Sequence, residues 1–377
     1  MASKWLIAGL LCFNIFIFCD TNELISVVTI FRHGNRAPNF LYTTDPYKEM
    51  ASEIWPEGFA ELTKVGKNQH YRLGKWLRQR YNDFLPEKYT NKFLYVLSSN
   101  VDRCLMSVSS NLAGLFPPRG YQVWNEELPW QPIPIHTKPQ TQDALLFAGK
   151  QCFKHIRLLQ EFHNSTTYQN FYKENKFIFD YVSNHTGMEV RDPDYLTAIH
   201  DILTIESKAN LTLPEWTKLV YPRHTLPIAV YSFSIPALTP ELARLKSGPL
   251  IDYIASFLEN SLYNPETAHK FLMMSGHDTT LSFLLTSLGI FDNSWPEYAS
   301  SVIFELWNKA NDSVVNIYFK NSTDLYPLQL PQCEFDCQLN KFQKIIEPIR
   351  VNEAEWEKEC VRGENIENIV VPKDPRL

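Results

Sequence analysis

The sequence predicts an α/β fold: a central, mostly parallel sheet flanked by helices, with a smaller and mainly α-helical cap. Three short apolar runs have the length and composition of buried strands, and they cover residues 25–31, 93–97 and 271–275. Apolar residues recur at helical spacing after the second and third runs, starting behind Arg103 and behind Asp278. A strand that leads directly into a helix is the repeating unit of such sheets.

The remaining elements follow from similar patterns. Residues 61–84 predict an amphipathic helix with an apolar face formed by Leu62, Val65, Leu73, Trp76 and Leu77. Residues 151–240 carry no site motif and contain helical stretches such as 195–208, which predicts the cap. Residues 301–307 and 314–319 flank a turn-like segment and predict a late β-hairpin. The cap would thus be inserted into an α/β domain formed by residues 21–150 and 241–377.

The N-terminal segment predicts a secreted, extracellular protein, with the lysosomal lumen as the alternative. Residues 1–20 combine one lysine with a short apolar core, as in a signal peptide; an uncleaved anchor is the other interpretation. Five sequons are typical of a glycosylated protein: Asn164, Asn184, Asn210, Asn311 and Asn321. The polar residues 370–377 predict no stable membrane anchor at that end. The net charge of −6 argues against a nucleic-acid partner.

The most informative motif directly follows the first predicted strand. It reads Phe-Arg-His-Gly-Asn-Arg-Ala-Pro over residues 31–38, so that His33 lies between Arg32 and Arg36. Guanidinium groups match phosphoryl oxygens, and an unprotonated imidazole is a competent nucleophile. Gly34 would let the backbone approach a ligand closely. The motif predicts a phosphoryl site with His33 as the attacking group; for its shorter core, a surface histidine with solvated arginines is the alternative.

Two further motifs also follow predicted strands. Arg103 comes after residues 93–97, and His277 and Asp278 come after residues 271–275. Ligands bind outside the carboxyl ends of the strands in open α/β sheets. We therefore expect these side chains and His33 to converge on one pocket.

The chain resembles the histidine acid phosphatases of the secreted and lysosomal branch. The resemblance rests on the first motif, on Val101-Asp102-Arg103, on Ser275-Gly276-His277-Asp278 and on the C-terminal cysteines, and it extends from about residue 25 to residue 360. Asn35 stands where many relatives have aspartate. The family's fold is a phosphoglycerate-mutase-like histidine phosphatase fold, so the resemblance implies that fold here.

The resemblance also implies a role for each motif residue. His33 would be the nucleophile and Asp278 the general acid, and the phosphoryl oxygens would be bound by Arg32, Arg36, Arg103 and His277. With three arginines and one imidazolium, neither a metal ion nor another cofactor is expected. Each role has an alternative. Asp278 could only cap a helix, and Arg103 could be a structural ion-pair partner. The two histidines could ligate a metal, although no typical zinc spacing is present.

The cysteine pattern and one further segment carry family features. The resemblance implies disulfides between Cys152 and Cys360 and between Cys333 and Cys337, and it leaves Cys104 as a small core residue. The segment around Trp130 and His136 resembles the family's dimer edge, which predicts a homodimer; packing of Trp130 in the core is the alternative.

The implied activity is hydrolysis of a small-molecule phosphate monoester by a secreted acid phosphatase. Narrower alternatives are a phytase-like enzyme and a lysophospholipid phosphatase. A catalytically silent secreted binding protein or allergen is the alternative from another class. A phytate site should gather additional lysines and arginines near the motifs, and none cluster there. All six polar site residues are present, which favours an active enzyme.

Overall fold

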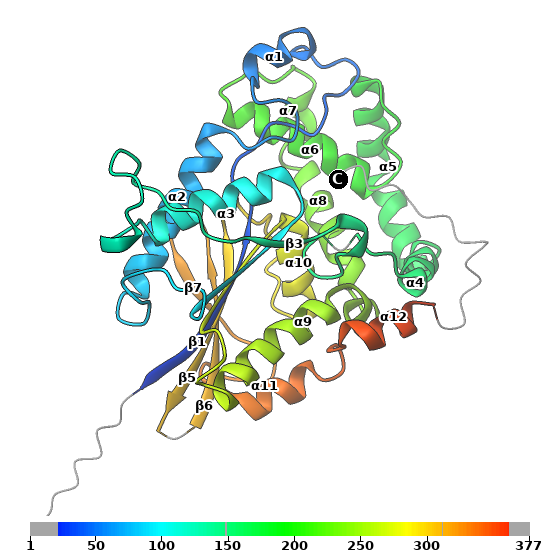
Figure 1. Ribbon diagram of the computed structural model, residues 1–377. Helices are drawn as coiled ribbons and strands as arrows, with labels where there is room; N and C mark the ends of the chain where they lie inside the picture. The colour runs from blue at the N-terminus through cyan, green and yellow to red at the C-terminus, as the bar shows by residue number, and fades with distance from the viewer. Residues whose placement is uncertain (1–21, 148, 311, 362–377) are drawn as a thin grey trace, which may run out of the picture.

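The computed structural model describes residues 22–147, 149–310 and 312–361 (Figure 1). The predicted signal peptide, the sequon at Asn311 and the polar C-terminal residues lie outside these ranges. Among the described residues, no helix has both the length and the apolar character that crossing a membrane requires.

A mixed sheet runs through the centre of the molecule. Its strand order is β3 (His136–Lys138), β2 (Leu94–Ser99), β4 (Phe271–Gly276), β1 (Glu23–Arg32), β5 (Ser301–Lys309), β6 (Asp312–Lys320) and β7 (Leu325–Leu328), and β8 (Cys337–Gln338) also pairs with β6. The strands from β3 to β1 are parallel to one another. The hairpin β5–β6 that the sequence predicts is present, and it continues the sheet in antiparallel pairing.

Strand residues alternate between two hydrophobic clusters, one on each face of the sheet. Val28, Leu272 and Met274 pack with α9 (Pro240–Tyr263), α10 (Asp278–Ser287) and α11 (Leu339–Ile346). Val27 and Met273 point to the other face, where they pack with α2 (Lys64–Arg80) and α3 (Asp102–Leu115). Because successive side chains of a strand point to opposite faces, near-continuous apolar runs are needed when helices cover both.

The amphipathic helix is shorter than predicted, and the prediction that Val65 lies on its buried face is wrong. Helix α2 begins at Lys64, and its buried residues are Gly66, His70, Leu73, Gly74 and Leu77. Val65 is 60% exposed. With about 100° of rotation per residue, Val65 lies roughly 80° away from Leu73 around the helix, outside the buried stripe.

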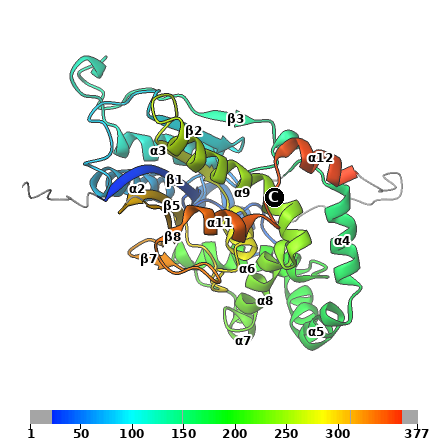
Figure 2. The same cartoon turned by 90° about the horizontal axis from the view of Figure 1, so that it is seen from below.

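The middle of the chain forms helices that gather beyond the carboxyl ends of the strands (Figures 1 and 2). They are α4 (Phe153–His163), α5 (Thr166–Thr186), α6 (Pro193–Lys208), α7 (Thr217–Val220) and α8 (Thr225–Ser234). A separate hydrophobic cluster joins α5, α6 and α8, and it includes Tyr42 from the loop after β1. Helix α6 starts cleanly because the Asp192 side chain accepts hydrogen bonds from Asp194 N and Tyr195 N, each at 3.0 Å.

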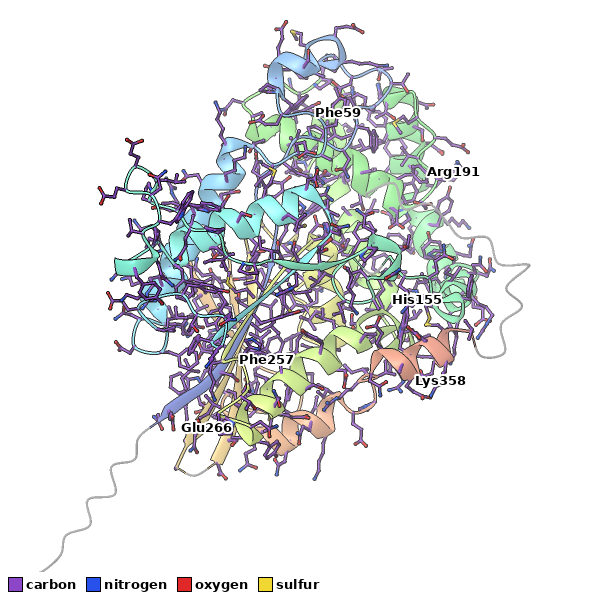
Figure 3. All side chains as sticks on the ribbon, viewed as in Figure 1. Phe59, His155, Arg191, Phe257, Glu266 and Lys358 are labelled. Carbon is purple, nitrogen blue, oxygen red and sulfur yellow. A yellow bond between two sulfur atoms is a disulfide. The ribbon has the colours of Figure 1, made fainter. Side chains whose placement is uncertain are left out.

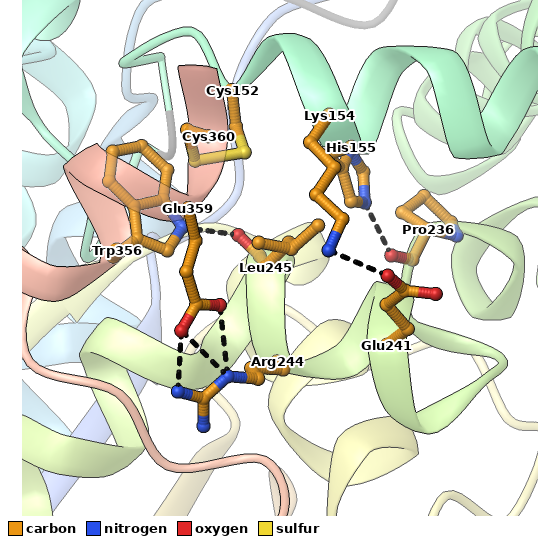
Figure 4. Close-up of a disulfide and its surroundings, with 10 residues drawn as sticks. All are labelled: Cys152, Lys154, His155, Pro236, Glu241, Arg244, Leu245, Trp356, Glu359 and Cys360. Atoms are coloured by element: carbon orange, nitrogen blue, oxygen red, sulfur yellow. Dashed lines mark hydrogen bonds and ion pairs between the residues drawn. A yellow bond between two sulfur atoms is a disulfide. The ribbon is translucent and has the colours of Figure 1, made fainter. Parts of the chain in front are cut away.

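Smaller elements complete the described chain. They are α1 (Ala51–Ile54), α12 (Glu353–Val361) and four 3₁₀ turns at Lys48–Met50, Gly120–Gln122, Gln140–Gln142 and Ile235–Ala237. Side chains such as Arg191 and Lys358 project outward from the surface (Figure 3). Both disulfides implied by the resemblance are present, and the Cys152–Cys360 bridge ties α4 to α12 (Figure 4). Cys104 is free and buried.

Three of the predicted sequon asparagines are exposed: Asn164, Asn184 and Asn210. Asn321 is half-buried, and its side-chain oxygen accepts hydrogen bonds from the backbone of its own turn. Trp130 is 37% exposed, so it does not belong to the core. His136 is also exposed, and its ring stacks on Tyr95 with 4.6 Å between centroids.

Candidate active site

The three motifs meet at the carboxyl ends of adjacent parallel strands. His33 directly follows β1, His277 directly follows β4, and Arg103 lies in the first turn of the helix after β2. Asp278 begins α10. The predicted convergence follows from the strand order, because β2, β4 and β1 are neighbours in the sheet.

The backbone around His33 is held on both sides. His33 N donates to Gly276 O at 3.0 Å, and Ala299 N donates to His33 O at 3.1 Å. The sequence predicts that Gly34 lets the backbone approach a ligand, but in the structure Gly34 is needed for packing against α2. A Cβ at Gly34 would lie 2.4 Å from Gly66 O in α2, so the small residue lets the motif loop pack directly on that helix.

The hydrogen bond of the His33 ring defines which nitrogen can attack. Nδ1 lies 2.9 Å from Gly34 O, and a carbonyl oxygen only accepts, so Nδ1 carries the proton. Burial, followed by the charges of Arg103 and Arg32, holds the pKa of His33 well below its usual value. The ring is therefore neutral at mildly acidic pH, and Nε2 keeps its lone pair.

Three buried guanidinium groups surround this imidazole. Arg32, Arg36 and Arg103 are 2%, 5% and 6% exposed, and the Nε atom of each has no hydrogen-bond partner among the described residues. Buried cations need a charged partner. The group as a whole is therefore suited to an anion that offers several oxygens.

Two of these arginines also contact carboxylates. Arg32 Nη2 lies 2.8 Å from Asp278 Oδ2, and its Nη1 donates to Pro296 O at 2.6 Å. Arg36 Nη2 donates to Asp201 Oδ2 at 2.9 Å. Asp201 belongs to α6 and has no motif around it. The sequence analysis missed it because only the folded chain brings this helix to the strand ends.

The titration of the second motif is set by burial and by the arginines. Burial alone would raise the pKa of Asp278, but Arg32 and Arg36 together hold it below its usual value. Burial and the charge of Arg103 lower the pKa of His277 to about 3. His277 is thus a neutral ring in the free site, whereas the sequence analysis expected an imidazolium.

A pocket opens over most of these groups, and Arg32 is not among its lining residues. Besides His33, Arg36, Arg103, His277 and Asp278, it is lined by Asn39, Phe40, Thr197, Ala198, Asp201, Ile202, Phe233, Thr279 and Trp295. Most of the added lining is apolar or neutral, and it contains no lysine. The site therefore offers one strong anion-binding centre beside a largely uncharged wall.

In the parts of the chain that the structure describes, no three His, Cys, Asp or Glu side chains are grouped so that they could hold a metal ion.

The chain is similar to known proteins over most of its length. The family model described as histidine phosphatase superfamily (branch 2) matches residues 23–186 and 227–321. The lysosomal acid phosphatase of Xenopus laevis is 36% identical over 93% of this chain and 82% of its own length. The human prostatic acid phosphatase is 36% identical over 90% of this chain and 88% of its own length.

Solved structures of lower identity share the fold. The phytase of Citrobacter braakii superposes with a TM-score of 0.65 at 18% identity, covering 91% of this chain and all of that one. A Hafnia alvei phytase in complex with tartrate has a TM-score of 0.65 at 17% identity, covering 88% of this chain and 98% of that one.

Proposed function

Since the chain belongs to the histidine phosphatase superfamily, we propose that it is a secreted acid phosphatase that hydrolyses phosphate monoesters through a phosphohistidine on His33. One observation carries the proposal. The unprotonated Nε2 belongs to a neutral His33 that three buried arginines surround, and among the described residues the Nε donors of these arginines have no partner. This arrangement suits a nucleophile that faces a bound phosphoryl group.

In the first step, His33 Nε2 forms a bond to phosphorus while the bond from phosphorus to the ester oxygen breaks. The charge spread over the phosphoryl oxygens is stabilised by Arg32, Arg36 and Arg103, with a further hydrogen bond from His277. The arginines act on oxygens, which leaves phosphorus open to in-line attack.

Asp278 would supply the proton that the leaving alkoxide needs. Its ion pair with Arg32 keeps the carboxyl ionised in the free site. A bound phosphate anion would share Arg32 and add a like charge, both of which raise the pKa of the carboxyl. In the second step, water attacks the phosphohistidine, Asp278 takes up a proton from that water, and His33 is released.

The pocket lining argues against a phytase-like preference. A ligand with several phosphates needs several cationic subsites, and besides Arg36 and Arg103 the only charged side chains in the lining are the carboxylates Asp201 and Asp278. The likeness to solved phytases concerns the fold. The apolar lining by Phe40, Ile202 and Phe233 suits a monoester with an uncharged leaving group.

Further parts of the proposal concern compartment, domains and assembly. Relatives named lysosomal and prostatic acid phosphatases, five sequons and the N-terminal segment support export with a cleaved signal. We place the cap at residues 151–240. A homodimer through the edge strand β3 is supported by exposed aromatic residues before it, namely Tyr121, Trp124 and Trp130.

Trapping the intermediate tests the mechanism. The enzyme should hydrolyse p-nitrophenyl phosphate at pH 5 equally well with and without EDTA. Rapid denaturation during turnover should yield an acid-labile, base-stable phosphoryl adduct that His33→Ala abolishes together with activity. Full activity of His33→Ala, or a strict requirement for an added divalent metal, would contradict the proposal and favour a metal-activated water.

A further inference from the structure

The tautomer of His277 decides whether this ring can help to bind a phosphoryl group. Burial and Arg103 lower its pKa to about 3, so only one ring nitrogen carries a proton at the working pH. A nitrogen that faces an anion must carry that proton, because a lone pair would repel the phosphoryl oxygens. Something in the fold must therefore place the proton.

The two ring nitrogens have different neighbours. Nδ1 lies 3.5 Å from Arg103 Nη2, so it faces the side chain of Arg103. Nε2 lies 3.0 Å from the hydroxyl oxygen of Ser99, at the carboxyl end of β2. Ser99 is fully buried, so no solvent competes for this contact.

Cys104 packs against the same ring without replacing the serine. Its Sγ lies 3.9 Å from Nδ1 and 3.7 Å from Nε2, and its S–H donates to Gly276 O at 3.3 Å. A thiol at these distances fills space beside the ring. The short polar contact to Nε2 comes from the hydroxyl.

A serine hydroxyl can either donate or accept. If Ser99 accepted from Nε2–H, the lone pair of Nδ1 would accept from Arg103 Nη2 at 3.5 Å in the free site, and it would repel the oxygens of a bound anion. If Ser99 donates to Nε2, the proton is on Nδ1, which then donates to a phosphoryl oxygen while Arg103 turns its own donors to the same group. Only the second arrangement supplies donors alone to the anion.

We propose that Ser99 is a positioning residue, which donates to His277 Nε2 and so keeps the ring proton on the nitrogen that faces the phosphoryl group. The inference rests on the role assigned to His277 in the proposed function. Ser99 itself lies outside the set of residues that line the pocket, so it acts through the ring.

Ser99→Ala tests the hydroxyl, and Ser98→Ala is the matched control. Ser98 is the preceding residue of the same strand, is equally buried, and donates to Ser99 O at 2.8 Å, away from His277. We expect Ser99→Ala to lower kcat/KM for p-nitrophenyl phosphate and to weaken inhibition by inorganic phosphate, each by about tenfold. Ser98→Ala should change both by less than about twofold, and Ser99→Thr, which keeps the hydroxyl, should restore most of the loss.

A spectroscopic measurement separates this role from a structural one. In protein labelled with ¹⁵N-histidine, the His277 resonances, assigned by their loss in His277→Gln, should report a proton on Nδ1 in the presence of phosphate. Ser99→Ala should shift them toward a mixture of tautomers. A proton on Nε2 in the wild type, or equal losses in Ser99→Ala and Ser98→Ala, would overturn the inference. An inactive wild type would contradict the proposed function, and the tautomer measurement would still decide the role of Ser99.

Discussion

Asp278 enters the catalytic cycle from the ionised state, because its carboxylate is paired with Arg32 at 2.8 Å. The carboxylate can therefore act as a proton donor only after it takes up a proton in the enzyme–substrate complex, where the bound phosphate raises its pKa. The low pKa of His33 serves the nucleophile. It keeps the imidazole neutral at an acidic pH at which a carboxyl group can still be protonated. A neutral His33 and an Asp278 that is protonated only with substrate bound allow nucleophilic attack and proton donation to take place in one pocket.

The roles of Asp278 and Arg103 can be told apart by the leaving group. Asp278→Asn should slow an alkyl phosphate by about two to four powers of ten, and p-nitrophenyl phosphate much less, because p-nitrophenolate leaves with little help from an acid. Arg103→Ala should slow both esters similarly, because it removes charge stabilisation common to both transition states. Steady-state kinetics with the two esters measure this. Equal slowing by Asp278→Asn would assign the carboxylate to positioning.

At the scale of elements, the motif loop depends on its direct contact with α2. A Cβ at Gly66 would lie 2.2 Å from Asn35 O, so neither the helix nor the loop can keep its place after substitution. Gly66→Ala should lower the melting temperature by several degrees and reduce kcat, because the loop carries His33. Val65→Ala, at the neighbouring but exposed position, is the control and should change neither quantity. An unchanged activity in Gly66→Ala would show that the loop tolerates displacement.

A second contact between elements links the loop after β1 to α6. Glu206 is fully buried beside Asp45, and burial together with the Asp45 charge raises the pKa of Glu206 from its ordinary 4.5 to about 9. The folded state then binds this proton more tightly than the unfolded state. The free energy of unfolding should therefore fall as the pH rises from about 4.5 toward 9, by at most about 1.4 kcal/mol per pH unit.

Urea unfolding at pH 5, 7 and 8.5 measures this dependence. Glu206→Gln mimics the protonated side chain, so it should flatten the decline in stability. Glu215→Gln, with a side chain that is 83% exposed, should keep the wild-type slope. If the free energy of unfolding falls equally with pH in the wild type and in Glu206→Gln, another group is responsible for the pH dependence.

At the scale of the whole molecule, the Cys152–Cys360 disulfide closes the longer of the two disulfide loops that the structure describes. It joins residues 208 positions apart, next to a hydrogen bond from Trp356 Nε1 to Leu245 O at 2.7 Å and an ion pair between Arg244 and Glu359 (Figure 4). The Cys333–Cys337 disulfide joins residues only 4 positions apart. In the chain-entropy estimate the long loop contributes about 5 kcal/mol and the short one about 2 kcal/mol.

Paired serine substitutions test the ranking. Replacing Cys152 and Cys360 should lower the melting temperature clearly more than replacing Cys333 and Cys337, with both variants measured without reductant. Non-reducing peptide mapping of the wild type should recover both bridges, with Cys104 as a free thiol. A bridge that contains Cys104 would refute this pairing.

Local sequence determined the strands and helices that carry the site. The apolar runs before His33, Arg103 and His277 indicate strands that are covered on both faces, and that pattern is readable because it depends on neighbouring residues alone. The same runs end in the motif side chains, so a shared pocket at the strand ends could be predicted. The extent of α2 was predicted less well, because apolar residues near a helix end, such as Val65, are buried or exposed according to the partner helix.

Tertiary structure decided how these side chains are held and protonated. Asp201 reaches Arg36 from a helix 165 positions away, and Ser99 reaches His277 from 178 positions away. Neither contact leaves a local pattern, because each depends on how separate elements pack. The neutral state of His277 was likewise decided by burial and by the surrounding arginines, which act only once the chain has folded.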